Sequence, residues 1–121
     1  MTNSYDLDTL RADLDREFKP MTINVGGDEV VLRNLMRLGK KDRDAVTAAL
    51  KDVQDLQDDT QDPEVLGKLE SAVMTILSIV PADGKGKKLV SAVDGDLALA
   101  LKLLERWSEA TQSGEAQHSP A

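Results

Sequence analysis

Apolar residues follow the helical repeat over most of the chain, and the pattern first appears near the start. In "YDLDTLRADLDREF" (residues 5–18), Leu7, Leu10, Leu14 and Phe18 recur three or four positions apart. This spacing places them on one face of a helix, with the charged residues opposite. Residues that precede proline avoid the helical region, so the helix is expected to end before Pro20.

The period changes in residues 21–34. Two β-branched stretches flank Gly26 and Gly27, and glycines readily supply the positive φ that a tight turn needs. The pattern predicts a β-hairpin with strands near 21–25 and 30–34. Because an isolated hairpin is marginal in water, it must either pack within its own domain or accept a strand from a partner.

Two longer helices follow. "RLGKKDRDAVTAALKDVQDLQDD" predicts a second helix, followed by an acidic linker that reaches Asp62. Asp62, Pro63 and Glu64 then combine a capping aspartate, a proline at the first helical position and an acid at the positive end of the dipole. The third helix should run to Pro81 and be largely buried, since its polar residues form one narrow stripe: Glu64, Lys68, Ser71, Thr75 and Ser78.

The last part of the chain predicts a short helix over 87–93 and a final helix that begins near 94–96. "DLALALKLL" alternates like a strand, but Lys102, Glu105, Arg106 and Glu109 share one helical face, which favours a helix. Residues 112–121 are small and polar, and we expect a disordered tail there. The prediction is therefore one mainly α domain over 1–111, with four to five helices, a hairpin at 21–34 and a flexible tail at 112–121.

The composition of the chain excludes several classes of function. The chain has 121 residues, enough for one domain with a modest core, and no cysteine, which excludes disulfides, thiolate metal sites and cysteine nucleophiles. The net charge of -7 argues against nonspecific nucleic-acid binding, which draws on Lys and Arg. "SAVMTILSIVPA" is too short to span a bilayer, and residues 1–20 lack a secretory core. We expect a cytoplasmic protein.

No pattern in the chain predicts catalysis. Its single histidine, His118, lies in the expected tail, where a fixed catalytic geometry is not expected. "VGGDEV" and "DGKGKKL" lack the spacing of nucleotide-binding loops, and "DVQDLQDDTQD" lacks the glycine and the distal glutamate of a calcium loop. The sequence therefore predicts neither an enzyme nor a metal or cofactor site.

Two groups of residues are candidates for binding a partner. The basic residues, Arg33, Arg37, Lys40, Lys41 and Arg43 with Lys85, Lys87 and Lys88, form either ordinary solvated surface or a site for an acidic protein. In the last helix an apolar stripe belongs either to the core or to an exposed protein-binding patch. Tryptophan is enriched at interface hot spots, and the stripe comprises Leu97, Leu101, Leu104 and Trp107.

The order of these parts resembles a known family. "F-K-P" leads into the hairpin, followed by "VVLRNLMRLGKKDRDAV", the apolar middle helix, "GKKLVSAVDGDLALALKLLERW" and "TQSGEAQHSP". From Tyr5 to Pro120 the chain is similar to the tail assembly chaperones of long-tailed bacteriophages that infect actinobacteria. The most specific parts are "LRNLMRLGKKDR" and the tryptophan followed by "TQSGEAQHSP".

This resemblance implies a function in the host cytoplasm, as a helper that is absent from the finished virion. Such proteins bind the tape measure protein, keep it soluble and help recruit tail-tube subunits. The gene commonly yields a second, longer product by ribosomal frameshifting, and this chain would correspond to the shorter one. Self-association is also expected, because many copies would coat a long client. The rival interpretations are a small helical regulator or nucleic-acid adaptor that uses the basic clusters, and a structural head–tail protein.

Overall fold

Five α-helices and one β-hairpin make up the described part of the chain, and this confirms the predicted fold class. A computed structural model describes residues 6–58 and 61–118, with side chains described as far as residue 111. The elements are α1 (Leu7–Glu17), β1 (Met21–Val25), β2 (Asp28–Leu32), the 3₁₀ turn η1 (Leu35–Arg37), α2 (Lys40–Leu56), α3 (Pro63–Ile79), α4 (Gly86–Val93) and α5 (Leu97–His118).

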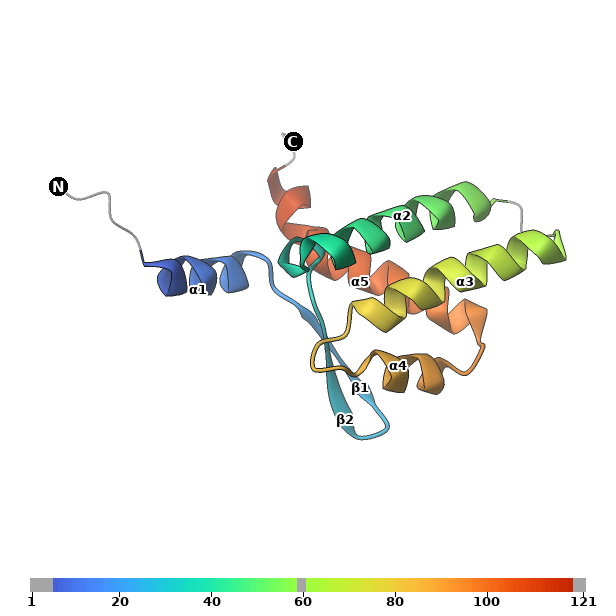
Figure 1. The fold of residues 1–121 in the computed structure, drawn as a ribbon, viewed down its shortest axis with the longest axis horizontal. Helices are drawn as coiled ribbons and strands as arrows, with labels where there is room; N and C mark the ends of the chain where they lie inside the picture. Colours follow the sequence, from blue (N-terminus) through green and yellow to red (C-terminus); the bar gives the residue numbers. More distant parts are fainter. Residues whose placement is uncertain (1–5, 59–60, 119–121) are drawn as a thin grey trace.

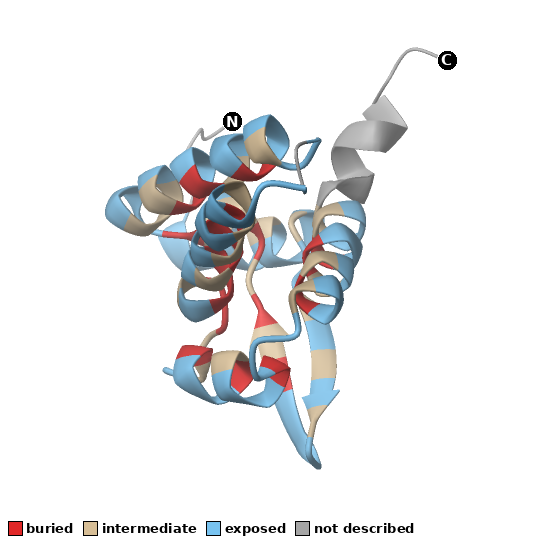
Figure 2. Cartoon of the chain, turned by 90° about the vertical axis from the view of Figure 1, so that its right-hand side faces the viewer, coloured by how far each residue is buried: buried red, intermediate tan, exposed pale blue. Residues whose placement is uncertain are grey.

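Helix α3 is the centre of the fold, and α2, α4 and α5 all pack against it (Figure 1). Its start is as predicted: the Asp62 carboxylate accepts the backbone N–H of Glu64 at 2.9 Å, and Pro63 is the first helical residue. The predicted polar stripe is exposed, while the remaining faces supply much of the core (Figure 2). The buried residues of α3 are Leu69, Ala72, Val73, Ile76 and Leu77.

The hairpin differs slightly from the prediction. Gly26 and Gly27 alone form the turn, with φ of 57° and 90°, which matches the two-residue type I′ geometry. Strand β2 therefore begins at Asp28 and ends at Leu32, rather than covering 30–34. Arg33 then bonds to the end of α3: its backbone N–H donates to the carbonyl of Val80 at 3.2 Å.

The end of α5 is attached to the segment that follows β2. The indole N–H of Trp107 donates to the carbonyl of Arg33 at 2.9 Å, and the side-chain amide of Asn34 donates to the carbonyl of Thr111 at 2.7 Å. Both side chains are buried, Trp107 to 2% exposure. These two bonds join segments more than seventy positions apart and fix α5 against the hairpin.

Helix α1 is the exception to the packed body. It has no buried residue, Leu7 is 65% exposed, and Figure 1 shows α1 extending away from the other helices. An ion pair of 3.0 Å between Asp15 and Arg37 connects it to η1. The predicted amphipathic pattern is present, but Leu7 and Leu10 of its apolar face stay exposed, while Leu14 and Phe18 are half-buried.

The predicted tail boundary at 111 falls inside a helix, because α5 extends to His118. The side chains of residues 112–118 and all of residues 119–121 lie outside the described residues. The flexibility of 112–121 therefore stays a prediction.

Candidate interaction surface

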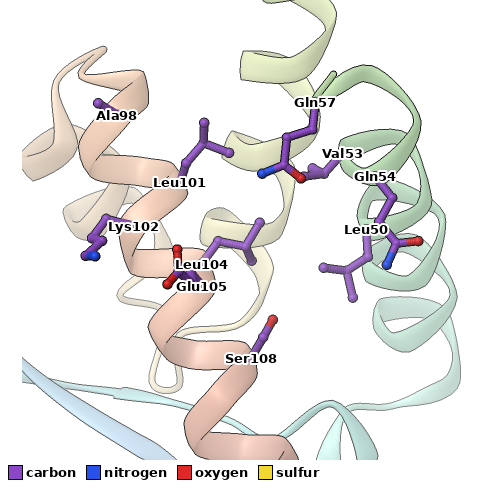
Figure 3. A pocket seen from close by; sticks show the side chains of 10 residues that line it. All are labelled: Leu50, Val53, Gln54, Gln57, Ala98, Leu101, Lys102, Leu104, Glu105 and Ser108. Atoms are coloured by element: carbon purple, nitrogen blue, oxygen red, sulfur yellow. The ribbon is translucent and has the colours of Figure 1, made fainter. Parts of the chain in front are cut away.

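One candidate site is a groove between α2 and α5, here called the α2–α5 groove. Both helices pack on α3, which separates them and leaves an open space of about 400 Å³. Figure 3 shows Leu101 and Leu104 of α5 facing Leu50 of α2 across this space. The lining residues are Leu50, Val53, Gln54, Gln57, Ala98, Leu101, Lys102, Leu104, Glu105 and Ser108.

The groove has an apolar floor and a polar rim. Val53 and Leu104 are buried, whereas Leu50 and Leu101 are half-buried and accessible at the surface. The exposed amides Gln54 and Gln57 stand on the α2 side, and Lys102 and Glu105 stand on the α5 side. A groove of this kind suits the apolar face of an amphipathic helix, which would bury its leucines while its polar residues meet the rim.

The structure divides the predicted apolar stripe of α5. Leu101 and Leu104 line the α2–α5 groove, Leu97 is half-buried and Trp107 lies in the core. Of the four, Leu97 and Leu101 are accessible to a partner, because Leu104 and Trp107 are 5% and 2% exposed. Partner binding by these residues stays a prediction.

Sequence reasoning missed the opposite wall of the groove. The helical period places Leu50 and Val53 on the apolar side of the second helix, and no pattern in the sequence singles out the amides Gln54 and Gln57. The helical period identifies the face to which Leu50 belongs, but it does not tell which helix packs beside that face. A groove depends on the spacing between α2 and α5, and this spacing is set by α3.

The residues of the first basic cluster differ in their surroundings. Arg37 pairs with Asp15, Lys40 and Lys41 are exposed at the start of α2, and Arg43 is half-buried. None of these four lines the α2–α5 groove. Arg33, included with them in the sequence, has another function: its guanidinium donates to the carbonyls of Ile79 and Val80 at 2.6 and 3.1 Å, which satisfies the end of α3.

In the second basic cluster, Lys85 and Lys88 contact strand β2 of the hairpin. The ammonium of Lys85 donates to the carbonyl of Glu29 at 3.0 Å, and Lys88 forms an ion pair with Asp28. The hydrogen bond and the charge of Lys88 lower the pKa of the Asp28 carboxyl below its ordinary value. Both residues therefore link α4 to the start of β2.

This ion pair predicts a pH effect that can be measured residue by residue. The pKa of Asp28 is lower in the folded protein than in the unfolded chain, so its stabilising effect is complete above the ordinary aspartate pKa and is lost as the pH falls through the lowered value. We expect a carboxyl-detected NMR titration to place the pKa of Asp28 below the ordinary aspartate value. Lys88→Gln should raise the Asp28 pKa towards its ordinary value, while Lys87→Gln should not. If the pKa of Asp28 is the same in Lys88→Gln and Lys87→Gln, this would contradict the ion pair between Asp28 and Lys88.

Within the described residues, no three metal-ligating side chains gather at one place. No described helix has the length and apolar character needed to cross a bilayer.

Comparisons with known proteins agree with the resemblance seen in the sequence. The family model described as mycobacteriophage tail assembly protein matches residues 1–116. Among relatives, the tail assembly protein Gp24 of Mycobacterium phage L5 is 31% identical and that of Mycobacterium phage D29 is 34% identical, with full coverage of both chains in each case. Gp25 of phage L5 is 30% identical over 94% of this chain, which covers 46% of Gp25. No solved structure matches the chain.

Proposed function

Because the chain belongs to the mycobacteriophage tail assembly protein family, we propose that it acts as a chaperone for the tape measure protein, the long helical chain that sets tail length. In this proposal it binds helical segments of the client in the host cytoplasm, keeps them soluble, helps recruit tail-tube subunits and is absent from the finished virion. It transforms no substrate and needs no cofactor.

The observation that carries the proposal is the α2–α5 groove. A tape measure protein presents long stretches of helix, and an apolar helical face exposed to water tends to aggregate. The groove offers Leu50 and Leu101 at an accessible apolar floor, with polar side chains on both rims. Helix-in-groove binding would cover client leucines at spacings of three and four without fixing the polar part of the client sequence.

The charge of the chain suits this task. A net charge of -7 favours solubility, and this helps to keep a complex in solution while apolar surfaces are covered. The rim of the α2–α5 groove carries one positive and one negative side chain, Lys102 and Glu105. It therefore favours neither an acidic nor a basic client helix.

The family includes a short and a long relative in the same phage, and this supports the proposal that one gene yields two products. Gp24 and Gp25 of phage L5 both match this chain, and Gp25 is about twice as long as the matched part. We propose that this chain is the shorter of two products, the longer made by ribosomal frameshifting. The second product would carry the same groove together with a further segment for another tail component.

The test is co-expression with the tape measure protein of the same phage. The wild-type chain should keep the client in the soluble fraction, and Leu50→Gln with Leu101→Gln should return most of the client to the pellet. Met36→Gln is the matched control, because it removes an exposed apolar side chain that does not line the α2–α5 groove. If the groove variant, folded by its melting curve, rescues the client as well as Met36→Gln does, the groove is not the binding site.

The alternative function is a regulator or adaptor that binds nucleic acid through Arg37, Lys40, Lys41 and Arg43. Binding of this kind weakens steeply with salt. We expect no saturable binding to double-stranded DNA or to RNA at physiological salt. Binding that Lys40→Ala with Lys41→Ala abolishes would favour the alternative.

A further inference from the structure

The two outer edges of the hairpin differ in whether their outward backbone groups have hydrogen-bond partners. The Gly26–Gly27 turn makes Val25 and Asp28 a hydrogen-bonded pair. Since bonded and non-bonded pairs alternate, the backbone groups of Thr22 and Asn24 on β1 point away from β2. On β2 the outward carbonyls are occupied: that of Val31 accepts the backbone N–H of Ala82 at 2.8 Å, and that of Glu29 accepts Lys85.

The outer edge of β1 has no such hydrogen-bonded cover among the described residues, although α5 contacts the strand. Among the described residues, no backbone group of Thr22 or Asn24 has a hydrogen-bond partner outside the hairpin. Natural edge strands are commonly protected by charged side chains, yet residues 20–27 carry no charge in a protein of net charge -7. Acidic residues would repel a second chain, and they are missing from this edge.

An apolar groove lies beside the same strand and is here called the β1 groove. It measures about 390 Å³, and no β2 residue lines it, so it lies on the β1 side of the hairpin. Its exposed wall is Leu99, which is 49% exposed. The lining residues are Ile23, Asn24, Val25, Gly26, Leu89, Ala92, Val93, Leu99 and Leu103.

We propose that β1 pairs with β1 of a second copy of this chain, antiparallel and centred on Ile23, to form a continuous four-stranded sheet. In this register Thr22 stands opposite Asn24 of the second copy, and Asn24 stands opposite its Thr22. These are the residues whose backbone groups point outward, so each pair exchanges two backbone hydrogen bonds. The arrangement is isologous: one strand is its own partner, and the assembly closes at two copies.

The apolar surfaces also favour a second copy over another occupant. Antiparallel pairing brings the start of the second copy's β1, and the α1 that precedes it, to the hairpin tip where the β1 groove lies. Helix α1 exposes Leu7 to 65% and Leu10 to 39%, which its own chain leaves uncovered. A five-residue strand pair alone buries less than the roughly 1,200 Å² of a standard interface. The leucines of α1 and Leu99 can supply the remaining apolar area. This inference concerns assembly and does not depend on the client.

The first test uses the wild-type chain without client. Sedimentation equilibrium should give twice the chain mass of 13.1 kDa at high concentration. In hydrogen exchange, the amides of Thr22 and Asn24 should become protected as concentration rises. A monomer at every concentration, or fast exchange of both amides in the associated state, would overturn the proposal. A monomer that protects these amides only with client present would assign the edge to an extended client segment instead.

The second test removes the edge donor. The N–H of Thr22 has no partner among the residues that the structure describes, so Thr22→Pro removes an outward donor while the hairpin keeps its own bonds. The dissociation constant of the dimer should rise at least about tenfold, because one hydrogen bond is lost on each side of the two-fold axis. Thr22→Val keeps the N–H and should dimerise like wild type. Trp107 fluorescence checks that each variant is folded. Unchanged association of folded Thr22→Pro would contradict the pairing.

Discussion

Replacing Trp107 with alanine should lower the free energy of unfolding by about 3–5 kcal/mol, the range for removing a large aromatic side chain from a core. Trp107 is 2% exposed, and its indole N–H satisfies the carbonyl of Arg33. The variant would leave a cavity and lose the bond that fixes α5 to the segment after β2. Urea unfolding followed by far-UV circular dichroism measures the change without relying on the tryptophan itself.

Trp107→Phe separates the two contributions. Phenylalanine keeps much of the apolar volume but donates no hydrogen bond, so the part-buried carbonyl of Arg33 loses its partner at a cost of about 1–3 kcal/mol. The phenylalanine variant should therefore lie between wild type and alanine. If Trp107→Ala costs less than about 1 kcal/mol, the indole is not part of the core and a partner-binding role for it gains support.

Replacing Gly86 with alanine should also be strongly destabilising, by about 1–3 kcal/mol or more. A Cβ at this position would come within 2.0 Å of the Ser78 carbonyl oxygen and 2.8 Å of its carbonyl carbon. These are backbone atoms near the end of α3, so relief requires the first turn of α4 to move away from α3. Thermal unfolding of the variant measures the effect.

Gly67 provides the matched control. It lies within α3, is exposed, and a Cβ there meets no atom within 4 Å. Gly67→Ala should be stabilising by about 0.5–1 kcal/mol, because alanine is the better helix former. The two identical substitutions should thus have opposite signs. A stable Gly86→Ala protein would show that α4 does not approach α3 as closely as described.

The elements were predictable because their signals are local. The helical period located α2, α3 and α5, Asp62 and Pro63 marked the start of α3, and the two glycines marked the turn. Lys102 and Glu105 decided in favour of a helix where "DLALALKLL" suggested a strand. The end of β2 was less predictable, since Arg33 leaves the hairpin to bond to Val80, which is distant in sequence.

The use of each side chain was not predictable, because it depends on which elements meet. Arg33 is one of several basic residues in sequence, yet it caps α3. Trp107 is typical of an interface residue and lies instead in the core, while Leu50 forms a groove wall with α5. The period of a helix tells which residues share a face, but not whether a neighbour covers that face. For the same reason, the sequence did not indicate that α1 would stay uncovered.

The family came from the order of whole segments, and the comparisons confirm it. No single residue carried that identification, because the family pattern contains no catalytic motif. The candidate binding site depends on the arrangement of α2 and α5, which the sequence does not show.

Methyl NMR of the chain with a soluble helical fragment of the tape measure protein tests the central claim most directly. The account predicts saturable shifts at the methyl groups of Leu50, Val53, Leu101 and Leu104, with the methyl groups of Val46 and Leu69 in the core nearly unchanged. Shifts confined to residues outside the α2–α5 groove, or no shifts at all, would contradict it.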